Sequence, residues 1–361
     1  MYEFQLTKIE IEGFKSIPEQ TIEFDMINVL IGSNGAGKTN LVSLFSMLQA
    51  IIEGNLQLYI AKHGGPDVFL NWGRKNTERL TVRFYFGNNG YGFTLEPTND
   101  NRMIFNREWF YWNMTGESNI ARGHTESAWK TGTHNRIDEY VQPILEKQKW
   151  RVYHFHDTGE SALVKQIQGI NDNMELANDA RNLAAFLYRL KETENASYQQ
   201  IVASVRMVAP YFDDFVLRPN PMNKDKISLE WKSVGSDIPF IASQLSDGTL
   251  RYICLATLLL QPSELQPETI IIDEPELGLH PYAVSILAGM IKKVAVYKQV
   301  ILSTQSVELL NEFNVRDVIV VNNKAGASTF SRLDAESLRL WLEDDYTLGE
   351  MWKHNLIGGR P

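Results

Sequence analysis

The fold of this chain is decided by the stretch Gly32-Ser33-Asn34-Gly35-Ala36-Gly37-Lys38-Thr39. The apolar run 27–31 precedes it and the apolar-rich segment 41–45 follows it, so the pattern predicts a buried strand, a glycine-rich loop and a helix. Backbone N–H groups of such a loop converge on phosphate oxygens, and the helix N-terminus adds partial positive charge. The context therefore predicts a site for the phosphates of a nucleoside triphosphate.

Two side chains at the end of this loop have the expected chemistry. Lys38 can reach the β- and γ-phosphates, and the hydroxyl of Thr39 can ligate Mg²⁺. We expect the nucleotide to be lined on this side by Asn34, Gly35, Gly37, Lys38, Thr39 and Asn40.

Composition limits the class of protein. The 361 residues are 43% hydrophobic, which is enough for a packed core. The best apolar run, 253–260, is half the length of a membrane span, and the N-terminus lacks a signal pattern, so we expect a cytoplasmic protein. The net charge of −9 argues against a broadly basic nucleic-acid surface but leaves room for a local basic groove. The single cysteine, Cys254, excludes an internal disulfide.

The middle of the chain changes character between two regions of strand–helix alternation. Alternating segments at 81–86 and 91–95 predict a β-hairpin with a turn at Asn88-Asn89-Gly90. The aromatic run 109–112 could stack on bases, but we expect it to pack on a sheet face. Residues 114–135 are rich in Gly, Ser and Thr and predict a mobile loop, and helices are expected at 180–192 and 197–208.

Two further segments suit a nucleotide site. The strand-like run 270–272 ends in Asp273, which can support a metal, and Glu274, which can act as a general base; solvated acids at a strand end are the alternative. The run Leu245-Ser246-Asp247-Gly248 opens a predicted helix, where Ser246 can bind an anion. Ser246 or Asp247 can equally cap the helix, and both roles can hold together.

In this order, the glycine-rich loop, the Leu-Ser-x-Gly run and the acid-tipped strand resemble the motifs of ABC-type ATPases, in particular their RecF, SMC and OLD branch. Residues 11–16 resemble the SMC-type turn near the adenine and sugar, which implies a nucleotide contact for Lys15. The segment 274–281 resembles the Glu-x-x-Leu-His-Pro run of RecF- and OLD-like ATPases, and Gln305 occupies their switch position.

The resemblance extends to a family of uncharacterised predicted bacterial ATPases over nearly the whole chain. The matching segments are Tyr153-His154-Phe155-His156-Asp157-Thr158, residues 182–184, residues 209–212, residues 348–352 and the final Gly358-Gly359-Arg360-Pro361.

The resemblance implies an α/β fold, an ABC-type P-loop ATPase head with a β-rich lobe and a helical insertion. The ATPase core would comprise residues 1–54 and 240–361, the β-rich lobe 55–150, and the helical and signature lobe 151–239. The implied cofactors are ATP and Mg²⁺.

The resemblance also implies roles for single residues. Lys38, Glu274 and Gln305 would be catalytic, and Thr39 and Asp273 would serve the metal. Ser246 and Gly248 would contact the γ-phosphate of a nucleotide held by a second copy, in a homodimer or higher homo-oligomer with composite ATP sites.

Two departures from the family pattern predict slow turnover. Gln305 can donate a hydrogen bond but, unlike the histidine common at this position, cannot titrate near pH 7. Asp247 replaces the second glycine of the signature, and its charge would repel a phosphate that it faced.

The histidines of the 153–158 segment allow three interpretations. His154, His156 and Asp157 are metal-ligand types, but no further His or Cys cluster completes a ligand set, so a structural role is favoured over a metal site. The third hypothesis, which we favour, is that His156 or Asp157 replaces the Gln loop that senses Mg²⁺ and the γ-phosphate.

Two functions fit these observations. The first is an ATP-driven dimer that acts on DNA, in repair or anti-phage defence. The second is a nucleotide-gated scaffold or regulator of a separately encoded effector nuclease, without direct DNA binding. A transporter ATPase is disfavoured because Ser246 lies much further beyond Thr39 than in the compact transporter arrangement, and because no membrane span is present.

Overall fold

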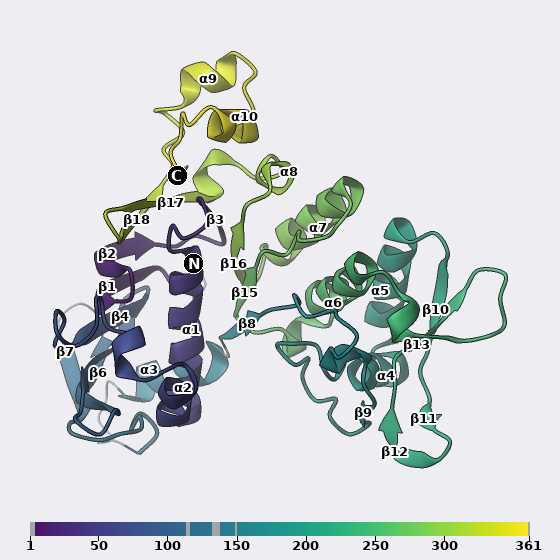
Figure 1. The fold of residues 1–361 in the computed structure, drawn as a ribbon, viewed down its shortest axis with the longest axis horizontal. Helices are drawn as coiled ribbons and strands as arrows, with labels where there is room; N and C mark the ends of the chain where they lie inside the picture. The colour runs from purple at the N-terminus through teal and green to yellow at the C-terminus, as the bar shows by residue number, and fades with distance from the viewer. Residues whose placement is uncertain (1–3, 113–115, 132–137, 149, 360–361) are drawn as a thin grey trace. The chain divides into compact units, whose positions relative to one another are not determined.

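The computed structural model describes residues 4–112, 116–131, 138–148 and 150–359 (Figure 1). The chain divides into two compact units, each built from separated stretches of sequence. Unit 1 comprises Met1–Val152, Pro267–Ile271 and Lys298–Pro361, and unit 2 comprises Tyr153–Gln266 and Ile272–Tyr297.

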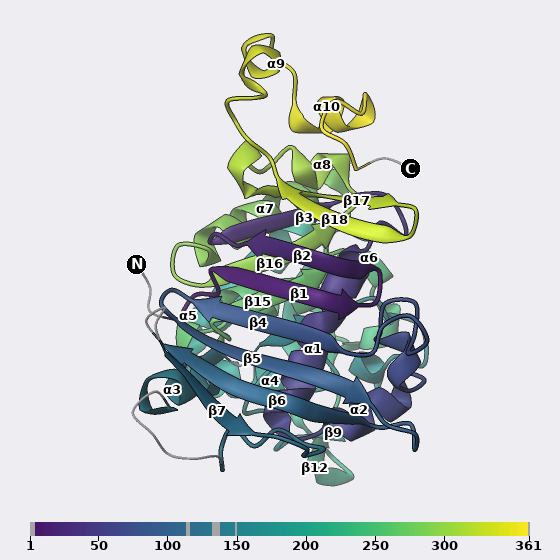
Figure 2. The same ribbon diagram turned by 90° about the vertical axis from the view of Figure 1, so that its left-hand side faces the viewer.

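Unit 1 contains a six-stranded antiparallel sheet in the order β2-β1-β4-β5-β6-β7. Its strands are β1 (Lys8–Phe14), β2 (Ile17–Glu23), β4 (Leu80–Phe86), β5 (Asn89–Pro97), β6 (Met103–Trp112) and β7 (Gly116–Ala121). From Lys8 to Glu12 the strand β1 alternates, with Ile9 and Ile11 buried and the polar residues between them less so, which matches the alternating sequence. Helix α1 (Lys38–Glu53) runs behind this sheet in Figure 2. Its Phe45 belongs to the same buried cluster as Ile11 and Phe84 of the sheet.

The β4–β5 hairpin is confirmed, but its predicted turn is wrong. Phe86 pairs with Asn89, so the two-residue loop is Gly87-Asn88, and Asn89 and Gly90 already belong to β5. Gly87 has φ 60°, which suits a hairpin turn with glycine at the first central position.

Two other expectations for the β-rich segment have different outcomes. The aromatic run 109–112 lies in β6, and the buried Trp109 and Phe110 confirm that it packs in the sheet. The expected mobile loop 114–135 is wrong for residues 116–121, which pair with β6 as strand β7. Residues 114–115 and 132–135 of that expected loop lie outside the described residues.

A second six-stranded sheet has the order β18-β17-β3-β16-β15-β8. Its strands are β3 (Ile27–Ile31), β8 (Arg151–Tyr153), β15 (Thr269–Asp273), β16 (Gln299–Thr304), β17 (Val318–Lys324) and β18 (Ala327–Arg332). Strand β3 is parallel to both β16 and β17, and the core residues 29–31 are fully buried, as their continuous apolar run predicts. The chain passes from unit 1 into unit 2 within β8 and again within β15.

The remaining helices of unit 1 surround these sheets or follow them in sequence. They are α2 (Leu56–Lys62), η1 (Pro66–Val68), α3 (Asp138–Gln148), α8 (Val307–Leu310), η5 (Val315–Asp317), α9 (Arg339–Glu343) and α10 (Leu348–Lys353). No helix in the described part of the chain is long and apolar enough to cross a membrane.

Unit 2 is a helical body with two small sheets. Its helices are α4 (Leu183–Thr193), α5 (Asn195–Val208), α6 (Asp247–Leu260), α7 (Pro281–Val294), η2 (Leu163–Lys165), η3 (Ala242–Gln244) and η4 (Ser263–Leu265). Its strands are β9 (Gln168–Gly169), β10 (Phe212–Val216), β11 (Pro219–Asn220), β12 (Asn223–Ile227), β13 (Glu230–Ser233) and β14 (Phe240–Ile241). Helix α6 is buried along residues 250–259, and a hydrogen bond of 2.7 Å joins its Tyr252 hydroxyl to Ser204 of α5. The helices expected from the sequence at 180–192 and 197–208 are confirmed.

Candidate functional site

The glycine-rich loop joins the end of β3 to the start of α1, as predicted. Gly37 is the N-cap residue, with φ 118° and no side-chain cap, and the first turn of α1 contains no acidic residue. The helix dipole gives this end of α1 a partial positive charge that no side-chain cap or acidic residue offsets, so it suits an anion. Thr39 is exposed in the first turn.

Lys38 lies under the loop. Its Nζ donates hydrogen bonds to the carbonyl oxygens of Gly32, at 2.5 Å, and Ser33, at 3.1 Å, and the side chain is buried. The ammonium group thus lies inside the turn that would surround a phosphate, as required of a residue that neutralises one.

A chain of short hydrogen bonds fixes the outer side of this loop. Ser16 accepts from Asn40 Nδ2 at 2.6 Å and shares a 2.7 Å bond with Ser328, which donates to the carbonyl of Ala36 at 2.6 Å. A Cβ at Gly37 would lie 2.1 Å from Ser328 Oγ, so only glycine fits at this point. The loop is therefore held in one conformation by a strand turn and by β18.

Gln305 and the C-terminal segment also flank the loop. Thr304 pairs with Ile31 in the parallel β16–β3 ladder, so the exposed Gln305 and Gly32 follow at the same sheet edge. Gly359 also approaches Gly32, because a Cβ built on Gly359 would lie 3.4 Å from the Gly32 Cα. Gly359 thus adjoins the phosphate loop, a contact that no local sequence pattern reveals.

Lys15 lies in the turn between β1 and β2. Its φ of 45° is unusual for a non-glycine residue, and its Nζ lies 5.6 Å and 5.4 Å from the ring centroids of Phe14 and Phe69. Burial lowers the pKa of the Lys15 ammonium.

In unit 2, the signature run begins helix α6. Ser246 is the N-cap residue, and its Oγ accepts a hydrogen bond from the Thr249 N–H at 3.2 Å, so the capping role is confirmed. Asp247 is exposed and forms an ion pair of 3.4 Å with Lys165. Lys165 therefore partly offsets the negative charge that distinguishes this signature.

Gly248 packs directly on the segment that follows the acidic strand end. A Cβ at Gly248 would lie 2.3 Å from the carbonyl oxygen of Gly278. The start of α6 and the loop before α7 are thus in contact at a position that admits no side chain.

Asp273 is the last residue of β15 and is buried, and two histidines flank it within unit 2. His156 Nε2 donates to the Asp273 carbonyl at 2.9 Å, and His154 Nδ1 lies 3.9 Å from the Asp273 carboxylate. Burial lowers the pKa of His154, although Asp273 acts in the opposite direction. Glu274 follows with φ 42°, a left-handed conformation of the kind found at functional sites.

The structure bears differently on the three hypotheses for the histidines of residues 153–158. His156 adjoins the backbone of Asp273, whereas Asp157 accepts a hydrogen bond from Gly159 N within its own turn. Within the described ranges, no group of three or more His, Cys, Asp or Glu side chains could hold a metal ion. A sensing role for His156 or Asp157 stays a prediction.

Arg251 connects the signature helix to both neighbouring segments. Its guanidinium donates to the carbonyls of Phe155, at 2.8 Å, His156, at 3.1 Å, and Leu277. Sequence reasoning missed this residue, although one signal was available: it is the one charged residue in a predominantly apolar run from Leu250 to Leu260.

The predicted site residues thus form two groups. Lys15, Asn34, Gly35, Gly37, Lys38, Thr39, Asn40 and Gln305 belong to unit 1, and Ser246, Gly248, Asp273 and Glu274 belong to unit 2.

Comparisons with known proteins give the following findings. Residues 27–311 match the sequence model of a family described as "AAA domain, putative AbiEii toxin, Type IV TA system". A solved structure described as the SmcHead bound to the C-winged helix domain of ScpA is 18% identical, with a TM-score of 0.60 over 92% of this chain and 99% of that one. A Smc head domain with an extended coiled coil, bound to the C-terminal domain of ScpA and derived from Pyrococcus furiosus, is 16% identical, with a TM-score of 0.57 over 94% and 99%. No curated protein matches the chain.

Proposed function

The chain belongs to this AAA-domain family, and we propose that it is an ATPase in which ATP joins two copies and so controls a DNA-related process such as repair or anti-phage defence. Its fold is that of an ABC-type P-loop ATPase head, as the sequence predicted. The observation that carries the proposal is the start of α1, where a helix N-terminus without a side-chain cap and the buried Lys38 meet at one loop. Such a site binds the phosphates of a nucleotide.

The chemistry of the proposed site follows from its donor groups. Lys38 neutralises the β- and γ-phosphates, and Gln305 donates a hydrogen bond to the γ-phosphate. The Thr39 hydroxyl and the Asp273 carboxylate are oxygen donors, which is the ligand class that Mg²⁺ prefers. When bound, Mg²⁺ neutralises charge on the phosphate oxygens.

Hydrolysis is assigned to Glu274. Its carboxylate accepts the proton of the attacking water, and Gln305 at the switch position cannot titrate near pH 7 to assist. We therefore propose slow turnover, in which the ATP-bound state persists long enough to serve as a signal.

The second half of each site is proposed to come from another copy of the chain. Ser246 and Gly248 contact the γ-phosphate held by the partner, and the Lys165–Asp247 ion pair reduces the repulsion that Asp247 would otherwise exert. The SmcHead likeness supports this arrangement at the level of the fold only.

Binding is tested with Lys38→Ala, which removes the loop ammonium. We expect Mg²⁺-ATP affinity measured by calorimetry to fall by two orders of magnitude or more, about 3 kcal/mol. Lys62→Ala, at the exposed end of α2, is the control and should bind as the wild type does. Unchanged affinity in Lys38→Ala would contradict the phosphate-loop assignment.

Assembly is tested with Glu274→Gln, which keeps the shape of the side chain but cannot act as a base. This variant should hold ATP unhydrolysed and shift to a dimer on size-exclusion chromatography with light scattering when ATP is added. An ATP-bound Glu274→Gln protein that stays monomeric would refute ATP-dependent pairing.

A second candidate function is a nucleotide-gated regulator of a separately encoded effector nuclease, without direct DNA binding. The net charge of −9 favours it, because nonspecific DNA binding rests on basic surface. Titrating the ATP-locked Glu274→Gln protein with duplex DNA at two salt concentrations separates the two. Salt-sensitive DNA binding supports the first function, and its absence together with ATP-dependent nuclease capture supports the second.

A further inference from the structure

Trp72 is the most exposed tryptophan of the chain, with 68% of its surface accessible, and it belongs to the loop after η1. A single exposed aromatic residue needs no explanation by itself. This one, however, lies in a loop held by several hydrogen bonds, beside the elements that fix the phosphate loop. Both properties follow from contacts within unit 1.

The backbone of Trp72 is held in an unfavourable conformation. Its φ is 58°, in the left-handed region that costs a bulky residue roughly 1–2 kcal/mol. The surrounding loop maintains it: Asn76 Nδ2 donates to the Trp72 carbonyl at 2.8 Å, and Gly73 N donates to Leu70 at 3.0 Å. Backbone strain that the surroundings maintain is a feature of ligand sites.

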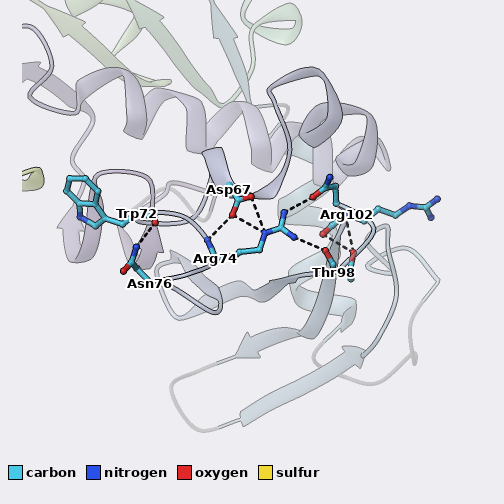
Figure 3. A network of polar contacts seen from close by, with 7 residues as sticks. Asp67, Trp72, Arg74, Asn76, Thr98 and Arg102 are labelled. Atoms are coloured by element: carbon cyan, nitrogen blue, oxygen red, sulfur yellow. Dashed lines mark hydrogen bonds and ion pairs between the residues drawn. The ribbon is translucent and has the colours of Figure 1, made fainter.

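Arg74, two residues after Trp72, anchors this loop, as Figure 3 shows. Its side chain contacts Asp67 at 3.0 Å, the Thr98 carbonyl at 3.1 Å and Asn101 Oδ1 at 2.7 Å. In the same figure the indole of Trp72 points away from this network. The network therefore holds the loop in place and leaves the ring available.

The Trp72 loop is bonded to the turn that contains Lys15. Asn71 N donates to the Gly13 carbonyl at 3.0 Å, and Asn71 Nδ2 donates to the Lys15 carbonyl at 2.5 Å. The same turn contains Ser16, which bonds Asn40 at the start of α1. Two hydrogen bonds, from Asn71 to the Lys15 turn and from Asn40 to Ser16 of that turn, thus connect the Trp72 loop to the end of the phosphate loop.

A second connection passes through the β17–β18 hairpin. A Cβ at Gly326 would lie 2.5 Å from Cζ2 of Trp72, so the indole packs against the hairpin at a residue with no side chain. Asn323 of the same hairpin donates to the Gly35 carbonyl at 3.4 Å. Because Asn323 and Gly326 are three residues apart, their Cα atoms lie within about 10 Å of each other. The hairpin therefore keeps the Trp72 indole near the phosphate loop.

We propose that the indole of Trp72 stacks on the base of the nucleotide whose phosphates lie at Gly32–Thr39. This inference rests on the proposed nucleotide-binding function and extends it from the phosphates to the base. One part of the ring packs against Gly326, and the remainder is open to a planar ligand. Because every base presents a π-face, stacking retains ATP and GTP alike and selects nucleotides over inorganic polyphosphate.

The test compares Mg²⁺-ATP and Mg²⁺-tripolyphosphate, because only the first has a base. In Trp72→Ala we expect ATP affinity by calorimetry to fall about 5- to 100-fold, and tripolyphosphate affinity to stay within about twofold of wild type. Trp72→Phe, which keeps an aromatic face, should retain most of the ATP affinity. GTP should lose affinity in Trp72→Ala by a factor similar to that of ATP.

Fluorescence supplies a second measurement that needs no folded alanine variant. ATP should quench the wild-type tryptophan emission, tripolyphosphate should not, and Trp72→Phe should abolish the quenching. The control is Trp341→Phe in α9, where the ring is 39% exposed and packs edge-on against Tyr346; quenching should persist there.

Three outcomes would overturn the proposal. If wild type binds ATP and Trp72→Ala binds it equally well, Trp72 does not contact the base. If Trp72→Ala loses ATP and tripolyphosphate by the same factor, its role is structural. If wild type binds tripolyphosphate but ATP no more tightly, the base has no subsite. A wild-type protein that binds neither ligand would instead refute the nucleotide-binding function on which the proposal rests.

Discussion

Removing the guanidinium of Arg251 should destabilise unit 2, because this one group donates hydrogen bonds to three backbone carbonyls in two different segments. Those carbonyls belong to Phe155 and His156 after β8, and to Leu277 before α7. Arg251 is itself only 6% exposed, and burial lowers the pKa of its guanidinium, although the charge of Asp247 opposes this. The side chain thus remains buried because its hydrogen bonds offset the loss of hydration.

The size of this destabilisation depends on whether water can replace the lost donor at each carbonyl. A hydrogen bond from a charged donor contributes about 1.5–3 kcal/mol net, and an unsatisfied buried acceptor costs about 1–3 kcal/mol. Phe155 is buried, so its carbonyl would lose its partner, whereas Leu277 is exposed and water can reach its carbonyl. We therefore expect Arg251→Ala to lower the free energy of unfolding of unit 2 by about 2–4 kcal/mol.

Two further substitutions separate the hydrogen bonds from packing. Arg251→Met keeps most of the volume and has no donors, so it should be nearly as destabilising as Arg251→Ala. Arg251→Lys keeps the charge but lacks the planar fork, so it should recover roughly half of the loss. Arg181→Ala is the control, since Arg181 forms an exposed 3.4 Å ion pair with Asp179 whose loss should cost under about 0.5 kcal/mol.

The assay is urea unfolding combined with hydrogen exchange by mass spectrometry. Peptides that cover residues 153–158 and 274–280 should lose protection first in Arg251→Ala, because their carbonyls lose the shared donor. If Arg251→Ala and Arg251→Met both unfold at the wild-type urea midpoint, the guanidinium does not hold these segments together. If Arg251→Met alone is as stable as wild type, packing rather than hydrogen bonding stabilises this region.

Two further predictions concern unit 2. Gly248→Ala should destabilise the protein by about 1–3 kcal/mol and weaken ATP-dependent pairing, because its Cβ would lie 2.3 Å from the Gly278 carbonyl. The control is Gly289→Ala in α7, where a Cβ has open space; this variant should be neutral or slightly stabilising in thermal melts. Cys254 should resist alkylation at pH 8 in the folded protein and react on unfolding, because burial raises the pKa of its thiol to about 12. Since the folded state retains this proton to higher pH than the unfolded state does, stability should fall as pH rises from about 9 toward 12, and a Cys254→Ala variant should lose that part of the pH dependence in urea titrations.

The local elements of the nucleotide-binding half were predictable because short-range physics encodes them. The apolar run 27–31 has to be buried, Gly37 accepts a backbone conformation that other residues avoid, and a helix follows where the apolar spacing requires it. The same reasoning predicted the cap at Ser246 and the α/β class. Each of these depends on residues that are close in sequence.

Local reasoning failed where neighbouring signals competed. Asn89 and Gly90 form a good turn pair, yet Gly87 makes the turn, because strand register places Phe86 opposite Asn89 and keeps the apolar faces of β4 and β5 aligned. The Gly- and Ser-containing segment 116–121 forms β7 because β6 offers it an edge to pair with. Pairing with a distant strand decided both cases.

The sequence by itself determined that this chain has a phosphate-binding loop between a buried strand and a helix, with an acid-tipped strand and a capped signature helix further along. Only the tertiary structure decided which distant residues support them: Arg251 across three carbonyls, His154 beside Asp273, and Trp72 against Gly326. The physical reason is that dihedral preference and hydrophobic periodicity act over a few residues. A hydrogen bond or ring contact between remote segments exists only after packing has set their separation and register.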